Sequence, residues 1–176
     1  KSQTEEMISM VNNILMSAKI DSGSMMLNKS EFIFNELLNN VKIGFTIITS
    51  KKGIEFEYFC DDNIKYIGDS LKIKEAIVNL LDNAFKYTEK GKVSFICKKS
   101  GDGVEIIISD TGFGFNTEEL EHVFEKYATV VRKRSTGTGL GMYIASEIIK
   151  LHGGYIELKS KPDEGSIFTI LLPSSG

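Results

Sequence analysis

The ten residues NLLDNAFKYT, positions 79–88, decide how the rest of the sequence is interpreted. They end a long amphipathic stretch whose apolar side chains recur at helical spacing: Ile73, Ile77, Leu80, Leu81 and Ala84. Four polar residues, Asn79, Asn83, Lys86 and Tyr87, stand three or four positions apart and therefore share one face of the predicted helix. Amide oxygens suit a hard cation such as Mg²⁺, and a lysine suits a phosphate. A solvated polar face is the alternative.

A second polar motif, DTGFG at 110–114, follows the apolar, strand-like run 104–109 directly. A carboxylate such as Asp110 at the end of a strand can accept a hydrogen bond from an exocyclic amine. Gly112 and Gly114 would let the backbone turn and approach a ligand. Taken alone, the motif also fits a plain turn.

A third motif, GTGLG at 137–141, opens a predicted helix at 139–151. Glycines before a helix expose backbone N–H groups, and the helix dipole favours an anion there. No strand directly precedes the motif and no Gly-Lys-Ser/Thr follows it, so neither a dinucleotide fingerprint nor a P-loop fits. The alternative is a flexible entry to the helix.

Periodicity and turn residues predict an α/β two-layer sandwich, with a mixed sheet of about five strands and helices on one face. Asn35 is the expected cap of the helix 36–50, and Asp69 or Ser70 the cap of the helix that ends near Thr88. The other expected helices are 117–126 and 139–151. The expected strands are 32–34, 54–60, 64–67, 92–99, 103–109, 155–160 and 166–172. The stretch 115–136 is long for a loop and is interpreted as a lid.

One further helix, at 4–20, precedes the sandwich. Met7, Val11, Ile14 and Ala18 alternate at spacings of four and three, which is typical of a helical bundle seam. A single helix cannot bury such a stripe alone and needs a partner helix or a second copy of the chain. We therefore expect a helical segment at 1–26 and the sandwich domain at 27–176.

Composition restricts the functions available to the 176 residues. The formal net charge of −3 does not favour nucleic-acid binding, and no apolar run approaches a membrane span. His122 and His152 do not suggest a metal site. Cys60 and Cys97 each lie in an apolar run, so two buried free thiols are expected. A disulfide or redox pair is the alternative, although no C-x-x-C spacing supports it.

In combination and in order, these segments resemble the nucleotide-binding boxes of the sensor histidine kinase catalytic domain. NLLDNAFKYT resembles its asparagine box, DTGFG its first glycine box and VFEKY its phenylalanine box. GTGLGMYIASEIIKLHGG resembles its second glycine box, and GSIFTILLP its last strand. The resemblance extends over 32–173. It implies the Bergerat ATP-binding fold that gyrase and the mismatch-repair ATPase MutL share.

The resemblance also implies a role for each motif residue. Asn83 would ligate Mg²⁺ with the catalytic Asn79 beside it, Lys86 would contact phosphate, and Tyr87 would pack on the adenine side. Asp110 would accept a hydrogen bond from the adenine amino group of ATP. The remaining implied cofactor-binding residues are glycine-box residues that shape the adenine pocket or hinge the lid and meet the phosphates: Gly112, Gly114, Gly137, Thr138, Gly139, Leu140 and Gly141.

The implied activity is transfer of the ATP γ-phosphoryl group to a histidine upstream of Lys1, for relay to the receiver domain of a response regulator. Residues 5–32 resemble the end of the family's dimerisation helices, so a homodimer is expected. A cytoplasmic domain is implied, and whether the full-length protein is anchored in the membrane stays open.

One departure concerns the arginine that many relatives carry just after the phenylalanine box, where this chain has Ala128-Thr129. Arg132 or Arg134 replacing it, and a solvated basic loop, are both open. A hydrolase of the gyrase type would carry a glutamate four residues before the metal-binding Asn83. Asn79 stands there instead, which favours a kinase. A nucleotide-binding scaffold without catalysis is the third alternative.

Overall fold

A five-stranded mixed sheet forms one layer of the fold in the computed structural model, which describes residues 3–128 and 138–174. Its strands are β2 (Ile54–Cys60), β4 (Gly91–Ser100), β5 (Gly103–Asp110), β6 (Tyr155–Lys161) and β7 (Gly165–Leu172). They lie in the order β2-β4-β5-β7-β6. The pair β2–β4 is parallel, and the other three neighbouring pairs are antiparallel.

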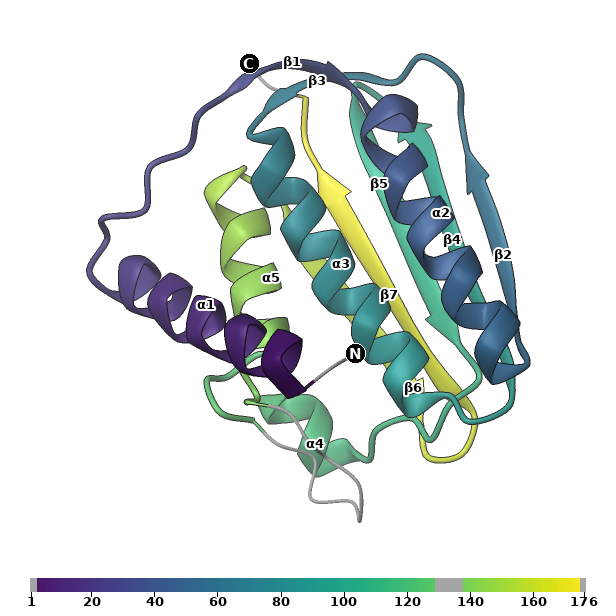
Figure 1. Ribbon diagram of the computed structural model, residues 1–176. Helices are drawn as coiled ribbons and strands as arrows, with labels where there is room; N and C mark the ends of the chain where they lie inside the picture. Colours follow the sequence, from purple (N-terminus) through teal and green to yellow (C-terminus); the bar gives the residue numbers. More distant parts are fainter. Residues whose placement is uncertain (1–2, 129–137, 175–176) are drawn as a thin grey trace.

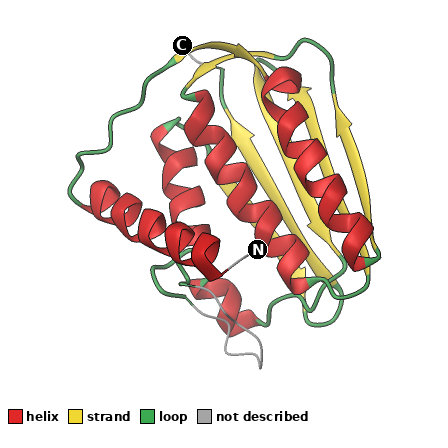
Figure 2. Ribbon diagram, in the orientation of Figure 1, coloured by secondary structure: helices red, strands yellow, loops and turns green. Residues whose placement is uncertain are grey.

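Three helices cover one face of this sheet, as Figures 1 and 2 show. They are α2 (Phe34–Lys52), α3 (Ser70–Tyr87) and α5 (Gly141–Leu151). A two-stranded antiparallel sheet of β1 (Ser30–Ile33) and β3 (Lys65–Gly68) lies at one end, and the short α4 (Thr117–His122) lies near the other. The prediction of a two-layer α/β sandwich with helices on one face is confirmed.

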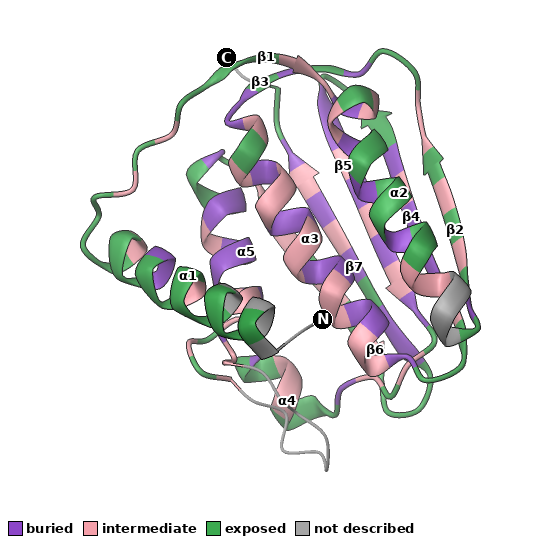
Figure 3. Cartoon of the chain, viewed as in Figure 1, coloured by how far each residue is buried: buried purple, intermediate pink, exposed green. Residues whose placement is uncertain are grey.

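The core lies between the two layers, and Figure 3 colours parts of α3, α5 and the central strands as buried. The apolar face predicted for α3 is fully buried: Ile73, Ile77, Leu80, Leu81 and Ala84. Phe85 at the end of this face stacks on Phe45 of α2, with ring centroids 5.1 Å apart, and meets Phe56 of β2 edge-on at 5.4 Å. These rings tie α2, α3 and the edge strand β2 into one core.

Several helix ends differ from the sequence-based expectation. Asp69 caps α3 as predicted, accepting a hydrogen bond of 3.1 Å from the Lys72 backbone N–H. The prediction that Asn35 caps α2 is wrong, because the cap position is Ile33 and no side chain bonds there. The fully buried Phe34 begins α2, so packing rather than capping sets this start.

Two later helices are shorter than predicted. α4 ends at His122 instead of 126. α5 begins at Gly141 instead of 139, since Gly139 has a φ of +67°, which a helix does not accommodate.

The first helix, α1 (Gln3–Asp21), lies beside α5 and outside the sandwich. Met16 and Ser17 are buried, but most of α1 is exposed in Figure 3. Met7, Val11 and Ile14 of the predicted stripe are 68%, 54% and 49% exposed. Over the described residues, none of the helices combines the length and apolar character needed to cross a membrane.

Candidate nucleotide-binding site

A pocket opens where β5 ends and β7 begins, next to the last turns of α3. It encloses about 390 Å³, including the space at its open mouth. Pairing of β5 with β7 places Asp110 directly opposite Ser166 at its base. The lining residues are Asn83, Ala84, Tyr87, Asp110, Phe113, Gly114, Phe115, Ser166 and Phe168. A mostly apolar wall with a few polar groups is typical of a small-molecule site.

Asp110 is the charged group of this pocket and is only 8% exposed. Its Oδ1 accepts a hydrogen bond of 2.8 Å from the backbone N–H of Gly112. Burial raises the pKa of Asp110 to about 6, although hydrogen bonds from the Gly112 and Ser166 backbones act in the opposite direction. At neutral pH the side chain is therefore a buried carboxylate, a strong acceptor for a donor on a ligand.

Both glycines of DTGFG lie where a larger residue would not fit. A Cβ on Gly112 would lie 2.5 Å from the carbonyl oxygen of Tyr87 and 2.8 Å from Oδ1 of Asp110. Gly114 has a φ of +61°, and a Cβ there would lie 1.9 Å from the carbonyl oxygen of Lys161. The loop after β5 therefore packs its backbone against α3 and β6, which leaves the pocket open above Asp110.

The polar face of α3 borders the pocket. Asn83 and Tyr87 line it, and burial raises the pKa of Tyr87. Nζ of Lys86 lies 5.1 Å from the centroid of the Tyr87 ring. Asn79, one turn earlier, has a buried Nδ2 without a hydrogen-bond partner among the described residues.

The side chain of Asn79 faces the start of α5. A Cβ on Gly141, the first residue of that helix, would lie 3.7 Å from Oδ1 of Asn79. The cap residue Leu140 supplies no side-chain cap, and its backbone N–H donates a long bond of 3.4 Å to Oγ1 of Thr138. Gly139 packs on the backbone of Tyr127, because a Cβ on Gly139 would lie only 2.6 Å from the carbonyl carbon of Tyr127. An uncapped helix N-terminus favours an anion.

The structure thus gathers most of the predicted site residues on α3, the end of β5 and the start of α5. Gly137, Arg132 and Arg134 lie outside the described residues, as does most of the second half of the predicted lid. The roles assigned to the individual residues remain predictions.

Five residues of the pocket wall were missing from the sequence-based site. Ala84 and Phe113 lie inside the predicted motifs but had no predicted role, and the other three lie outside the three polar motifs. Phe115 and Phe168 meet edge-to-face at 6.4 Å, and Ser166 lies opposite Asp110. Ser166 and Phe168 belong to β7, more than fifty positions after Asp110. Strand pairing brings them to the site, and no local pattern around them indicates a ligand. The apolar residue Phe115, directly after DTGFG, was the one sequence signal that could have indicated an additional wall residue.

The two histidines lie away from this pocket. Nε2 of His152 accepts a hydrogen bond of 3.0 Å from the Asp69 backbone N–H, and its Nδ1 lies 2.8 Å from the carbonyl oxygen of Ile148. Burial lowers the pKa of His152, so the neutral ring is a structural link between α3 and α5. His122 is exposed and pairs with Glu125 at 2.9 Å.

The chain is similar in sequence to known sensor proteins. The chain is 29% identical over 175 residues to the sensor histidine kinase RcsC of Escherichia coli K12, which covers 97% of the chain and 18% of that protein. It is 31% identical over 169 residues to the sensor protein SrrB of Staphylococcus aureus MRSA252, covering 93% of the chain and 29% of that protein. The chain thus spans less than a third of these relatives.

Among solved structures, full-length ShkA in complex with AMPPNP superposes with a TM-score of 0.83. The two are 24% identical, and the match covers 95% of this chain and 35% of ShkA, which shows a shared fold. The family model described as histidine kinase-, DNA gyrase B-, and HSP90-like ATPase matches residues 68–176. Because this match covers more than half of the chain and contains the whole pocket, the chain belongs to the family of histidine kinase-, DNA gyrase B- and HSP90-like ATPases.

Proposed function

We propose that the chain is the ATP-binding catalytic domain of a sensor histidine kinase, which transfers the γ-phosphoryl group of ATP to a histidine of another segment. The observation that carries this proposal is the buried carboxylate of Asp110 at the base of a mostly apolar pocket. Such a carboxylate accepts a hydrogen bond from a donor on a flat apolar ligand. The exocyclic amine of adenine is such a donor.

The adenine end of the site rests on Asp110 and the residues around it. Gly112 holds Oδ1 of Asp110 from one side, which leaves other lone pairs of the carboxylate for the ligand. Tyr87 from α3 and Phe113 from the loop after β5 supply the apolar walls. Guanine presents a carbonyl oxygen where adenine has its amine, so the same carboxylate would repel GTP.

The phosphate end rests on the unsatisfied groups near α5. The N-terminus of α5 has no side-chain cap and offers backbone N–H groups. The side chain of Asn79, whose buried Nδ2 has no partner among the described residues, lies beside the first residue of α5. Lys86 adds a positive charge on the same helix as Asn79. Thr138, Gly139, Leu140 and Gly141 would meet the phosphates, as would Gly137.

Mg²⁺ fits the amide oxygen of Asn83, which lines the pocket from α3. Over the described residues, no cluster of three His, Cys, Asp or Glu side chains could hold a metal alone. A magnesium ion that takes one or two protein oxygens and otherwise binds phosphates suits this donor set. When bound, the ion would neutralise negative charge on the phosphates, while Asn83 and Asn79 position it.

A kinase is favoured over a hydrolase by the side chain at position 79. Activation of a water needs a base, and the amide of Asn79 cannot take a proton. Phosphoryl transfer depends mainly on positioning and charge stabilisation, which Asn79, Lys86 and the start of α5 can provide. The acceptor histidine belongs to another segment, because His152 is buried between α3 and α5 and His122 is ion-paired with Glu125.

The exposed stripe on α1 supports a homodimer through the helical segment 1–26, with the catalytic domain at 27–176. Met7, Val11 and Ile14 are about half exposed or more, and a second copy of the helix would bury them.

The domain would lie in the cytoplasm, where ATP is available. The receiver domain of a response regulator would accept the phosphoryl group from the histidine.

Calorimetric titration with ATP and GTP in the presence of Mg²⁺ tests whether Asp110 recognises adenine. We expect ATP to bind more tightly than GTP, and Asp110→Asn to weaken ATP binding by about 1–3 kcal/mol, roughly 5- to 150-fold. Asp102→Asn, in the exposed turn between β4 and β5, is the matched control and should leave both affinities unchanged. Equal affinity for ATP and GTP in the unsubstituted chain would contradict Asp110 as the adenine reader.

A further inference from the structure

Cys60 and Cys97 lie next to each other on the neighbouring strands β2 and β4. The parallel register places the two residues directly opposite one another. Neighbouring strands are about 4.8 Å apart. Disulfide-linked residues have Cα atoms about 4.4–6.8 Å apart, so the backbone already holds the pair at a suitable separation. Residues in register on adjacent strands point to the same face of a sheet, and both sulfurs therefore lie on one side.

The two thiols differ in their access to solvent. Cys97 is completely buried, whereas Cys60 is half-buried and is the last residue of the edge strand β2. A small oxidant from solution therefore reaches Cys60 first. Cys97 is reachable mainly through its neighbour, which is the usual arrangement of an attacking and a resolving cysteine.

The surroundings also shift the pKa values of the two thiols in opposite directions. Hydrogen bonding from the Cys97 thiol, assisted by the Tyr58 hydroxyl, lowers the pKa of Cys60, against the effects of burial and of Asp61 and Asp62. The same contact raises the pKa of Cys97, which keeps its proton. The thiolate is the reactive form of cysteine, so Cys60 is the nucleophile of the pair.

We propose that Cys60 and Cys97 are an oxidation site, which hydrogen peroxide converts into a disulfide between β2 and β4 and a thiol reductant restores. The Cys60 thiolate attacks one peroxide oxygen, the O–O bond breaks, and the leaving hydroxide takes a proton to become water. The resulting sulfenic acid on Cys60 is then attacked by the Cys97 sulfur. An S–S bond forms, and the sulfenic oxygen leaves as a second water with the Cys97 proton. Two thiols are oxidised and one peroxide is reduced.

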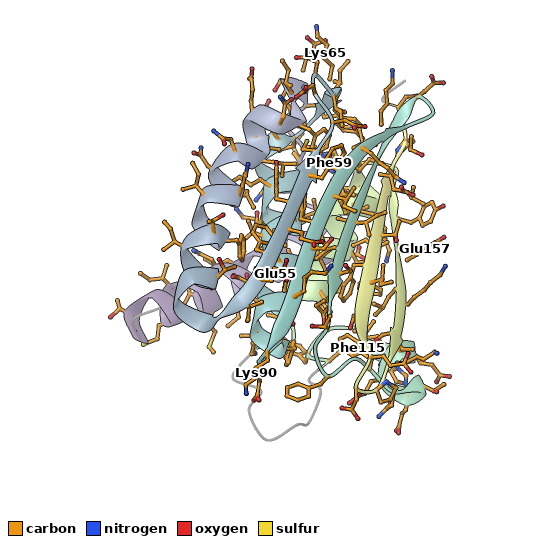
Figure 4. All side chains as sticks on the ribbon, turned by 90° about the vertical axis from the view of Figure 1, so that its right-hand side faces the viewer. Glu55, Phe59, Lys65, Lys90, Phe115 and Glu157 are labelled. Carbon is orange, nitrogen blue, oxygen red and sulfur yellow. The ribbon has the colours of Figure 1, made fainter. Side chains whose placement is uncertain are left out.

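This site is separate from the nucleotide pocket. Phe59, the neighbour of Cys60, lies toward one end of the sheet, and Phe115 of the pocket wall lies at the other end (Figure 4). The proposal consequently does not depend on the function assigned to that pocket.

The test uses the whole chain, reduced with dithiothreitol, freed of the reductant and treated with hydrogen peroxide. Remaining thiols are alkylated in denaturant, and the peptides are mapped by mass spectrometry without reduction. We expect a peptide crosslinked between Cys60 and Cys97, which disappears when dithiothreitol is added. The protein that yields this peptide should run as a single chain in non-reducing denaturing electrophoresis. Both cysteines remaining alkylated would overturn the proposal, as would a sulfinic acid on Cys60 or a link between two chains with Cys97 free.

Two variants test the order of the steps. In Cys97→Ala the second thiol is gone, so dimedone should trap more sulfenic acid on Cys60 than in the unsubstituted chain. In Cys60→Ser the nucleophile is gone, and Cys97 should stay alkylatable after peroxide. Oxidation of Cys97 in Cys60→Ser as fast as crosslinking in the unsubstituted chain would overturn the assignment. Cys97→Val, which fills the buried position with an apolar side chain, repeats the trapping if alanine loosens the core.

Discussion

Oδ1 of Asp110 accepts a hydrogen bond of 2.8 Å from the backbone N–H of Gly112, two residues further along the chain. The bond fixes the carboxylate at the base of the pocket and stabilises its charged form. Burial outweighs this effect, and the pKa of Asp110 is raised to about 6. The group proposed to read adenine therefore changes charge just below neutral pH, within easy experimental reach.

Affinity for ATP should decrease as the pH falls through 6. A raised pKa means that the free protein takes up a proton there, and ligand binding to the ionised carboxylate must then release it. We expect affinity to be constant well above pH 6 and to weaken by roughly tenfold per unit below it, if only the ionised form binds. Titration calorimetry with Mg²⁺ and ATP between pH 5 and 8 measures this.

The phosphates of ATP titrate in the same range, so Asp110→Asn is the matched control. Its pH profile contains the ligand's own titration, and subtracting it isolates the contribution of Asp110. Parallel profiles for the two proteins would show that the charge of Asp110 does not matter for binding.

A pair of glycine substitutions separates site geometry from general stability. A Cβ on Gly112 would meet Tyr87 and Asp110 at 2.5 and 2.8 Å, whereas a Cβ on Gly44 of α2 would meet nothing within 4 Å. We expect Gly112→Ala to weaken ATP binding at least as much as Asp110→Asn. Gly44→Ala should leave binding unchanged and raise the free energy of unfolding by about 0.5–1 kcal/mol, as alanine does in a helix. Titration calorimetry and urea unfolding of both variants provide the numbers.

The link between α1 and the sandwich gives a third prediction. Asp21, the last residue of α1, accepts a hydrogen bond of 3.0 Å from the Tyr143 hydroxyl of α5 and pairs with Lys126. Asp21→Asn removes the charge from both contacts, and amide hydrogen exchange in the last turn of α1 should become faster. Glu31→Gln, which breaks the exposed ion pair with Lys65, is the control. Equal exchange in α1 of both variants would show that Asp21 does not hold the helix.

The regular elements were predictable because local periodicity sets them. The apolar face of α3 follows from residue spacing, and the five strands of the large sheet follow from apolar runs bounded by turn residues. The family resemblance gives their arrangement. The start of α2 was not predictable in this way. Asn35 is a good cap residue, but burial of Phe34 outweighs capping and moves the helix start.

The site was predictable to the extent that its residues lie in continuous motifs. Asn83, Tyr87 and Asp110 come together in the pocket as their motifs indicate. Ser166 and Phe168 were missed because only the pairing of β5 with β7 brings them there. The sequence left the pairing of Cys60 with Cys97 open as an alternative for the same reason. Cys60 and Cys97 are neighbours through the register of β2 and β4, which no sequence spacing reveals.

The final prediction concerns Asn79, whose buried Nδ2 has no partner among the described residues. An unsatisfied buried donor costs about 1–3 kcal/mol, so Asn79→Ala should leave the free chain as stable as before, or more stable by up to about 1 kcal/mol. If phosphate or magnesium-bound water satisfies this amide, the variant should lose much of the thermal stabilisation that Mg²⁺ and ATP confer. Thermal unfolding with and without both ligands measures the two effects together. Asn39→Ala, on the exposed side of α2, should keep the full ligand-induced shift. A destabilised Asn79→Ala chain with an unchanged ligand-induced shift would mean that Asn79 serves the fold and not the nucleotide.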